Sequence, residues 1–298
     1  MLRTGTLILP HGITLHCRSS GSPDQPLLVF LHGFPEGSFI WEAMLHSFAH
    51  DFHCVAPDLR GYGHSSQPER TQDYRPKALV QDLVALIELL TPGRPAAAVV
   101  AHDWGGALAW NLANQHPRLM QQLVTINAPH PGSFLRELQH NPAQQAASQY
   151  MHYLRRPDAA AQLLEHDAAR LFDFFRLPDG AWPTWLTPAL RAQYLAHWRL
   201  GMHGPCQYYA ASPLVPPRGS DAGAQAISLP NDFLTINVPT HVLWGEQDVA
   251  LLPGLLSGLE AWIPDLQIHH QPHASHWLVH EQPQWLHEQL RQILNINT

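Results

Sequence analysis

Short hydrophobic runs alternate with segments of helical spacing through most of the chain. In the first 128 residues, β-like apolar runs are followed by stretches whose apolar residues recur every three or four positions. The continuous run at 96–101 predicts a strand that is buried on both faces. The alternation stops near Pro129 and resumes at Thr240. It predicts an α/β protein with a mostly parallel sheet covered by helices.

The expected elements divide the chain into a core and an insertion. Strands are expected at 5–9 and 13–17, as a hairpin, and at 27–31, 53–56, 96–101, 123–126, 240–244 and 266–270. Core helices are expected at 41–48, 76–90, 105–115, 252–262 and 283–294. Between them, prolines and glycines break the helices expected at 141–156, 159–176 and 188–200. We therefore predict a core domain of residues 1–128 and 230–298 and an inserted helical lid, or cap, of residues 129–229.

Composition and charge narrow the class of protein. The 298 residues are 45% hydrophobic and 14% charged, which is typical of a folded globular chain. The net charge is −7 and no basic stripe is present, so nucleic acid is excluded as an expected partner. Three widely spaced cysteines and the lack of a long apolar run predict a soluble cytoplasmic protein with no membrane partner. The oligomeric state stays open, a homodimer included.

A carboxylate occupies a sharp turn between a predicted buried strand and a helix. In the segment Val99-Val100-Ala101-His102-Asp103-Trp104-Gly105-Gly106, small residues around Asp103 allow close backbone approach. This pattern is typical of a nucleophile elbow with aspartate in place of serine. An aspartate is ionised at neutral pH and needs no base for its first attack. The simpler alternative is an aspartate that caps the helix.

Chain order favours the catalytic interpretation. Asp248 follows the predicted strand at 240–244, and His276 precedes the last helix. Nucleophile, acid and histidine in that order match the triad of α/β-hydrolases. Asp248 would orient His276, and His276 would deprotonate a water molecule.

Three motifs together resemble one family over nearly the whole chain. They are His32-Gly33-Phe34-Pro35-Glu36, Asp58-Leu59-Arg60-Gly61-Tyr62-Gly63-His64-Ser65 and His102-Asp103-Trp104-Gly105-Gly106. The chain resembles the epoxide hydrolases of the α/β-hydrolase fold. The resemblance implies an aspartate nucleophile at Asp103, an acid and histidine pair at Asp248 and His276, and an oxyanion hole made by the backbone N–H groups of Phe34 and Trp104.

The resemblance also implies two lid tyrosines that hold the epoxide oxygen. We assign them to Tyr153, just before a proline turn, and Tyr209, near the end of the lid. A protonated phenol can donate to the epoxide oxygen and then protonate the developing alkoxide. Tyr208 competes with Tyr209, and Tyr150 is a further nearby phenol. The substrate pocket is expected to be lined by His32, Pro35, Trp104, Tyr150, Tyr208 and Trp277.

The implied reaction needs no metal and no organic cofactor. Asp103 opens a lipophilic epoxide to form a covalent ester, and water activated by His276 releases a vicinal diol. Dehalogenation is the nearest alternative because the same carboxylate can displace halide. Trp104 matches a halide-binding tryptophan of haloalkane dehalogenases, but Phe34 stands where they have asparagine. Fluoroacetate dehalogenases carry arginines where this chain has Trp104 and Ala107.

Three other classes are disfavoured. A serine esterase would need a serine at position 103, and a receptor that had lost turnover would show a broken triad. The histidines near the end of the chain invite a metalloenzyme hypothesis, but they form no His-Glu-x-x-His motif. Those histidines are His269, His270, His273, His276 and His280.

Overall fold

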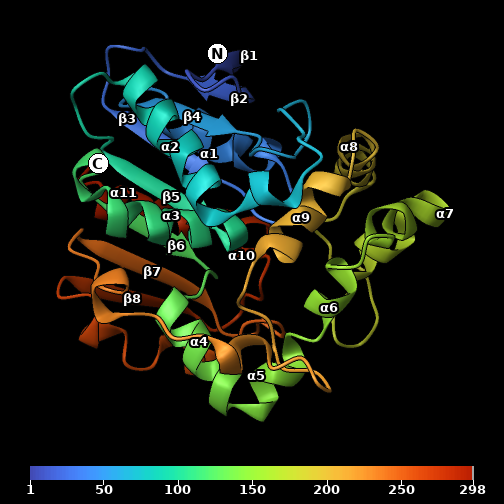
Figure 1. Ribbon diagram of the computed structural model, residues 1–298. Helices are drawn as coiled ribbons and strands as arrows, with labels where there is room; N and C mark the ends of the chain where they lie inside the picture. Colours follow the sequence, from blue (N-terminus) through green and yellow to red (C-terminus); the bar gives the residue numbers. More distant parts are fainter. Residues whose placement is uncertain (297–298) are drawn as a thin grey trace.

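An eight-stranded sheet forms the centre of the computed structural model, which describes residues 1–296 (Figure 1). The strand order is β1-β2-β4-β3-β5-β6-β7-β8. The hairpin of β1 and β2 is antiparallel, and the strands from β4 to β8 pair in parallel, which confirms the predicted α/β class. The strands are β1 (Arg3–Ile8), β2 (Thr14–Ser20), β3 (Leu27–Leu31), β4 (His53–Pro57), β5 (Ala98–His102), β6 (Leu123–Ile126), β7 (Thr240–Gly245) and β8 (Leu266–Gln271).

Helices cover both faces of this sheet. The helices outside the insertion are α1 (Glu42–Phe48), α2 (Pro76–Leu90), α3 (Asp103–Gln115), α10 (Leu278–Glu281) and α11 (Pro283–Ile293). Within residues 1–296, none of the helices combines the length and the hydropathy that crossing a bilayer would take.

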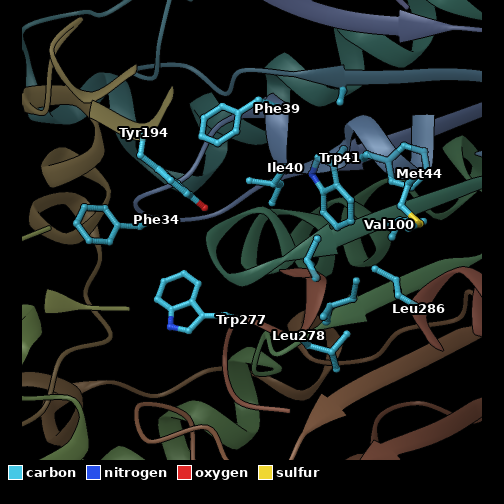
Figure 2. Packing of buried hydrophobic residues seen from close by; sticks show 14 of the residues in the cluster. Phe34, Phe39, Ile40, Trp41, Met44, Val100, Tyr194, Trp277, Leu278 and Leu286 are labelled. Atoms are coloured by element: carbon cyan, nitrogen blue, oxygen red, sulfur yellow. The ribbon is translucent and has the colours of Figure 1, made fainter. Parts of the chain in front are cut away.

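Neighbouring strand residues bury against opposite helical layers because side chains alternate across a strand. Val100 belongs to the hydrophobic cluster that includes residues of α1 and α11 (Figure 2). Val99 belongs to the cluster that includes residues of α2 and α3. Every residue of β5 is buried, as the continuous apolar run predicts.

The segment between β6 and β7 is helical, and α7 lies far from the sheet in Figure 1. It contains α4 (Pro131–His140), α5 (Pro142–Ala147), α6 (Tyr150–Leu154), α7 (Ala159–Asp173), α8 (Pro188–Trp198) and α9 (His203–Ala211). The sequence pattern predicted neither α4 nor α9, and it joined α5 and α6 into one helix.

The helix expected at 252–262 was a wrong prediction. The chain forms two short 3₁₀ turns there, Pro253–Leu256 and Leu259–Ala261. Between them, Gly258 has a φ of 75°, a left-handed conformation that ends helical geometry.

The fold brings the residues after four strands to one edge of the sheet. Parallel strands present their carboxyl ends at the same edge, so the residues that follow β3, β5, β7 and β8 meet there. Gly105, at the start of α3, lies against the end of β3. A Cβ atom at Gly105 would come within 2.6 Å of the His32 carbonyl oxygen and 2.7 Å of that of Leu31.

We expect Gly105→Ala to destabilise the fold, because β3 and α3 would have to separate to admit the methyl group. The expected loss in free energy of unfolding is about 1–3 kcal/mol. Chemical denaturation of the variant measures it. Gly5→Ala is the control, since a Cβ atom there meets nothing within 4 Å. Equal midpoints for the two variants would contradict the expected close contact.

Candidate active site

Asp103 stands at the junction of β5 and α3, with no residue between strand and helix. Its φ is 48°, in the left-handed region that side chains other than glycine seldom adopt. The Phe34 N–H, in the loop after β3, donates to Asp103 Oδ1 at 2.7 Å. A Cβ atom at Gly33 would come within 2.2 Å of the same oxygen, so this loop can approach the carboxylate only with glycine there.

His276 links the Asp103 carboxylate to a second one. Its Nδ1–H donates to Asp248 Oδ2 at 2.7 Å, and its Nε2 lies 3.7 Å from Asp103 Oδ2. Burial alone would lower the pKa of His276. The negative charges of Asp248 and Asp103 outweigh burial and raise that pKa to about 9. The imidazole is therefore protonated at neutral pH.

Asp248 is fixed by hydrogen bonds to both of its oxygens. The Ala250 and Leu251 N–H groups donate to Oδ1 at 2.8 and 2.9 Å. Asn127 Nδ2 donates to Oδ2 at 2.9 Å. Burial would raise the pKa of Asp248, but the His276 charge and these backbone hydrogen bonds hold it below its ordinary value. Our sequence reasoning missed Asn127, which follows β6 with a φ of 40°.

A cavity of about 230 Å³ opens beside Asp103. Among the described residues, Asp103 is the only charged side chain that lines it. The other lining residues are Pro76, Trp104, Ala107, Asn111, Pro129, Pro131, Phe134, Tyr150, Met151, Tyr209, Ser212, Pro213, Leu214, Leu229, Phe233 and Leu251. A carboxylate facing such a mostly apolar space suits a lipophilic electrophile.

Two phenols of the inserted helices face this carboxylate. Tyr150 on α6 and Tyr209 on α9 both line the cavity, and their ring centroids lie 6.0 Å apart. Burial raises the pKa of each phenol well above its ordinary value, and the Asp103 charge adds to the effect. Both hydroxyls therefore stay protonated at neutral pH and can donate hydrogen bonds.

Comparison with known proteins gives a consistent result. Residues 26–283 match the family described as alpha/beta hydrolase fold. The chain belongs to the α/β-hydrolase family. It is 32% identical to Epoxide hydrolase 3 of Xenopus tropicalis over 95% of this chain and 75% of the relative. It is 33% identical to AB hydrolase superfamily protein YfhM of Bacillus subtilis, over 92% and 91% of the two chains.

Solved structures similar to this α/β-hydrolase include epoxide hydrolases. The Bacillus megaterium epoxide hydrolase in complex with an inhibitor has a TM-score of 0.89 and 31% identity, over 98% of this chain and 100% of that one. Its F128A mutant, complexed with the product (R)-3-[1]naphthyloxy-propane-1,2-diol, has a TM-score of 0.88 and 31% identity over the same shares. The relatives identify this chain as an enzyme.

Tyr153, which we expected to be the first lid tyrosine, is not among the described lining residues of the cavity. Its ring lies near the guanidinium groups of Arg156 and Arg170, 5.7 and 5.8 Å from the ring centroid. Its hydroxyl is buried with no hydrogen-bond partner among the described residues. The short helix α6 presents Tyr150 to the cavity and packs Tyr153 beside Arg170 of α7.

Trp104 lines the cavity as expected, but four other residues predicted to line the pocket are absent from its described lining. His32 is fully buried and accepts from the Leu59 N–H at 3.0 Å. Pro35 follows a cis peptide bond, and its carbonyl accepts from Trp198.

The other two are Tyr208 and Trp277, which are held by backbone hydrogen bonds. The Tyr208 hydroxyl donates to the Arg60 carbonyl at 2.8 Å. The Tyr208 hydroxyl is therefore engaged with the backbone, whereas Tyr209 is among the described lining residues of the cavity. Trp277 donates to the Phe174 carbonyl, and its ring lies edge-on to His276 at 4.9 Å.

A buried glutamate network behind the triad also escaped the sequence reasoning. Glu36 Oε2 lies 3.1 Å from His102 Nδ1, and His102 Nε2–H donates to the His276 carbonyl at 2.8 Å. Glu36 Oε1 accepts from Tyr194 at 2.6 Å and lies 2.7 Å from His280 Nε2. Burial would raise the pKa of Glu36, but hydrogen bonds with His102 and His280 hold it well below its ordinary value. One indication of this role was present in the sequence, because Glu36 belongs to the motif His32-Gly33-Phe34-Pro35-Glu36.

Four of the five histidines that suggested a metal site take separate side-chain partners. His276 pairs with Asp248, and His280 with Glu36. His270 Nδ1 lies 2.9 Å from Glu246, and His269 Nε2 lies 3.1 Å from His241. Each of these four histidines therefore lies beside a different side chain.

We expect Asp248→Asn to lower the pKa of His276 more than Asp103→Asn does. Both substitutions remove a negative charge that stabilises the imidazolium, and Asp248 is the nearer and hydrogen-bonded partner. NMR titration of the His276 ring in the wild type and both variants measures the shift. An unchanged pKa in Asp248→Asn, or a larger fall in Asp103→Asn, would contradict this electrostatic account.

Proposed function

We propose that this α/β-hydrolase converts epoxides to vicinal diols through a covalent ester on Asp103. The observation that carries the proposal is a carboxylate in an apolar cavity with two protonated phenols beside it. A carboxylate can open a strained ring only if the departing oxygen is stabilised, and phenols supply that stabilisation. The relatives named epoxide hydrolases support the same reaction.

We propose that residues 129–229 form a cap over a core of residues 1–128 and 230–298. In this division the core supplies Asp103, Asp248 and His276, and the cap supplies Tyr150 and Tyr209. The substrate would be enclosed between core and cap, and this would keep bulk water away from the reacting carbon atoms.

In the first half-reaction, one Asp103 oxygen attacks an epoxide carbon and the carbon–oxygen bond of the ring breaks. Tyr150 and Tyr209 donate hydrogen bonds to the ring oxygen, and one of them transfers its proton to the alkoxide. The product is a hydroxyalkyl ester of Asp103 and a tyrosinate, which recovers its proton during the cycle. This assigns the first phenol to Tyr150, in place of Tyr153.

In the second half-reaction, His276 takes a proton from water and the resulting hydroxide attacks the Asp103 carbonyl carbon. Esterification removes the negative charge of Asp103, so one of the groups that raise the pKa of His276 is lost. The imidazole can then be neutral and act as a base. The Phe34 N–H, and the Trp104 N–H as proposed, stabilise the oxyanion. The alcohol oxygen leaves with a proton from His276, and the diol is released. The proton left on the Asp103 carboxyl group then returns to the tyrosinate, which restores both groups. Protein side chains and water supply every group in this sequence, so we assign no cofactor or metal.

Dehalogenation by the same carboxylate is the competing activity. Trp104 lines the cavity beside Tyr209, where its indole could face a halide. Ala107 also lines it, and no cationic side chain is among the described lining residues, which disfavours haloacids. Halide release from haloacetate and haloalkanes, measured beside diol formation, separates the two activities.

We expect the wild type to form diol from 1-naphthyl glycidyl ether and from styrene oxide, and Asp103→Asn to lose at least about 10³-fold in rate. The first substrate is the epoxide that corresponds to the diol bound by the Bacillus megaterium mutant. A single turnover in heavy-oxygen water should place the label on Asp103, as read by peptide mass spectrometry. Label found directly in the first diol would contradict the covalent route.

We expect Tyr150→Phe to slow ester formation by about 10²-fold, because it removes one donor to the epoxide oxygen. Tyr153→Phe is the matched control and should stay within about twofold of the wild type, since its hydroxyl has no described partner and lies off the cavity. Rapid-quench measurement of the ester gives both rates. The reverse order of effects would restore Tyr153 as the first phenol.

A further inference from the structure

Helix α8 packs directly against residues 33–38, which we call the Phe34 loop. Three α8 side chains at helical spacing, Tyr194, His197 and Trp198, lie on this loop. Tyr194 is fully buried beside Phe39, with ring centroids 4.9 Å apart, and Figure 2 shows it in the same cluster as Phe34, Phe39 and Trp277. The imidazole of His197 packs so closely on Gly37 that a Cβ atom there would lie 2.5 Å from its Cε1.

Two of these side chains bind the loop through hydrogen bonds. The Tyr194 hydroxyl donates to Glu36 Oε1 at 2.6 Å. Trp198 Nε1–H donates to the Pro35 carbonyl oxygen at 2.5 Å. Pro35 directly follows Phe34, whose N–H donates to the Asp103 carboxylate. The loop is therefore held between the nucleophile on one side and α8 on the other.

If the proposed function holds, the hydrogen bond from the Phe34 N–H stabilises ester hydrolysis and ester formation to different extents. Charge develops on the Asp103 carbonyl oxygen only when the ester is attacked, so the hydrogen bond gains strength in hydrolysis. During ester formation the carboxylate loses charge, and this hydrogen bond gains nothing. A displaced Phe34 N–H would thus slow hydrolysis and spare alkylation.

We propose that Tyr194 and Trp198 are positioning residues: helix α8 holds the Phe34 N–H where ester hydrolysis needs it. This inference rests on the proposed function. Packing of α8 on the Phe34 loop would then be required for hydrolysis of the ester, in addition to the role of the cap in enclosing the substrate. Trp198 binds the loop through the Pro35 carbonyl oxygen, whereas Tyr194 binds it through the buried Glu36 carboxylate. An effect shared by variants of both residues would therefore come from the loop they have in common.

The test is rapid-quench kinetics with an epoxide that the wild type hydrolyses, using Tyr194→Phe and Trp198→Phe. In each variant we expect hydrolysis of the Asp103 ester to slow by about tenfold, part of the 10²–10³-fold loss that follows removal of an oxyanion donor. Ester formation should stay within about twofold. The ester then accumulates at steady state, and kcat and KM fall together. Tyr153→Phe is the matched control for loss of a buried hydroxyl.

The ratio of the two rate constants decides the outcome, because a smaller folded fraction lowers the amount of active enzyme and leaves the ratio unchanged. Equal slowing of both steps, or an unchanged ratio in either variant, would overturn the positioning role. A wild type that forms no diol would overturn the proposed function itself. These two failures are distinct, since the second appears before any variant is made.

Discussion

The hydrogen bond between the Phe34 N–H and the Asp103 carboxylate is the contact on which the rest of the site depends. It requires Asp103 to adopt a positive φ at the end of β5 and requires glycine at position 33 to let the loop approach. Gly105 permits the close packing of α3 on β3 at the same point. The sheet therefore holds a carboxylate in a fixed direction, toward the cavity.

The charges around His276 set its protonation state. The neighbouring carboxylates raise the pKa of His276 to about 9, and the ring is held by Asp248 on one side and faces Asp103 on the other. In the proposed reaction, formation of an ester on Asp103 would cancel one of these charges. His276 would then become a base only after Asp103 had reacted, and this order would keep the two proposed half-reactions separate.

The sheet, the turn at Asp103 and the order of the triad could be predicted because they have local signals. A buried parallel strand is a continuous apolar run, and a strained turn needs small neighbours such as Gly105. The direction in which a tyrosine side chain points has no such local signal in the sequence. Tyr150 and Tyr153 lie one turn apart on α6, yet Tyr150 lines the cavity while Tyr153 packs beside Arg170 of α7. Glu36 and Asn127 were missed for a similar reason, since their partners are distant in sequence.

The covalent ester is the central claim, and the most direct measurement is the intact mass of His276→Gln after exposure to an epoxide. The account predicts that the protein gains the mass of one substrate molecule, and that fragmentation places the gain on Asp103. Its Asp103→Asn double mutant should gain nothing. Diol production by His276→Gln without any adduct, or an adduct on another residue, would contradict the account.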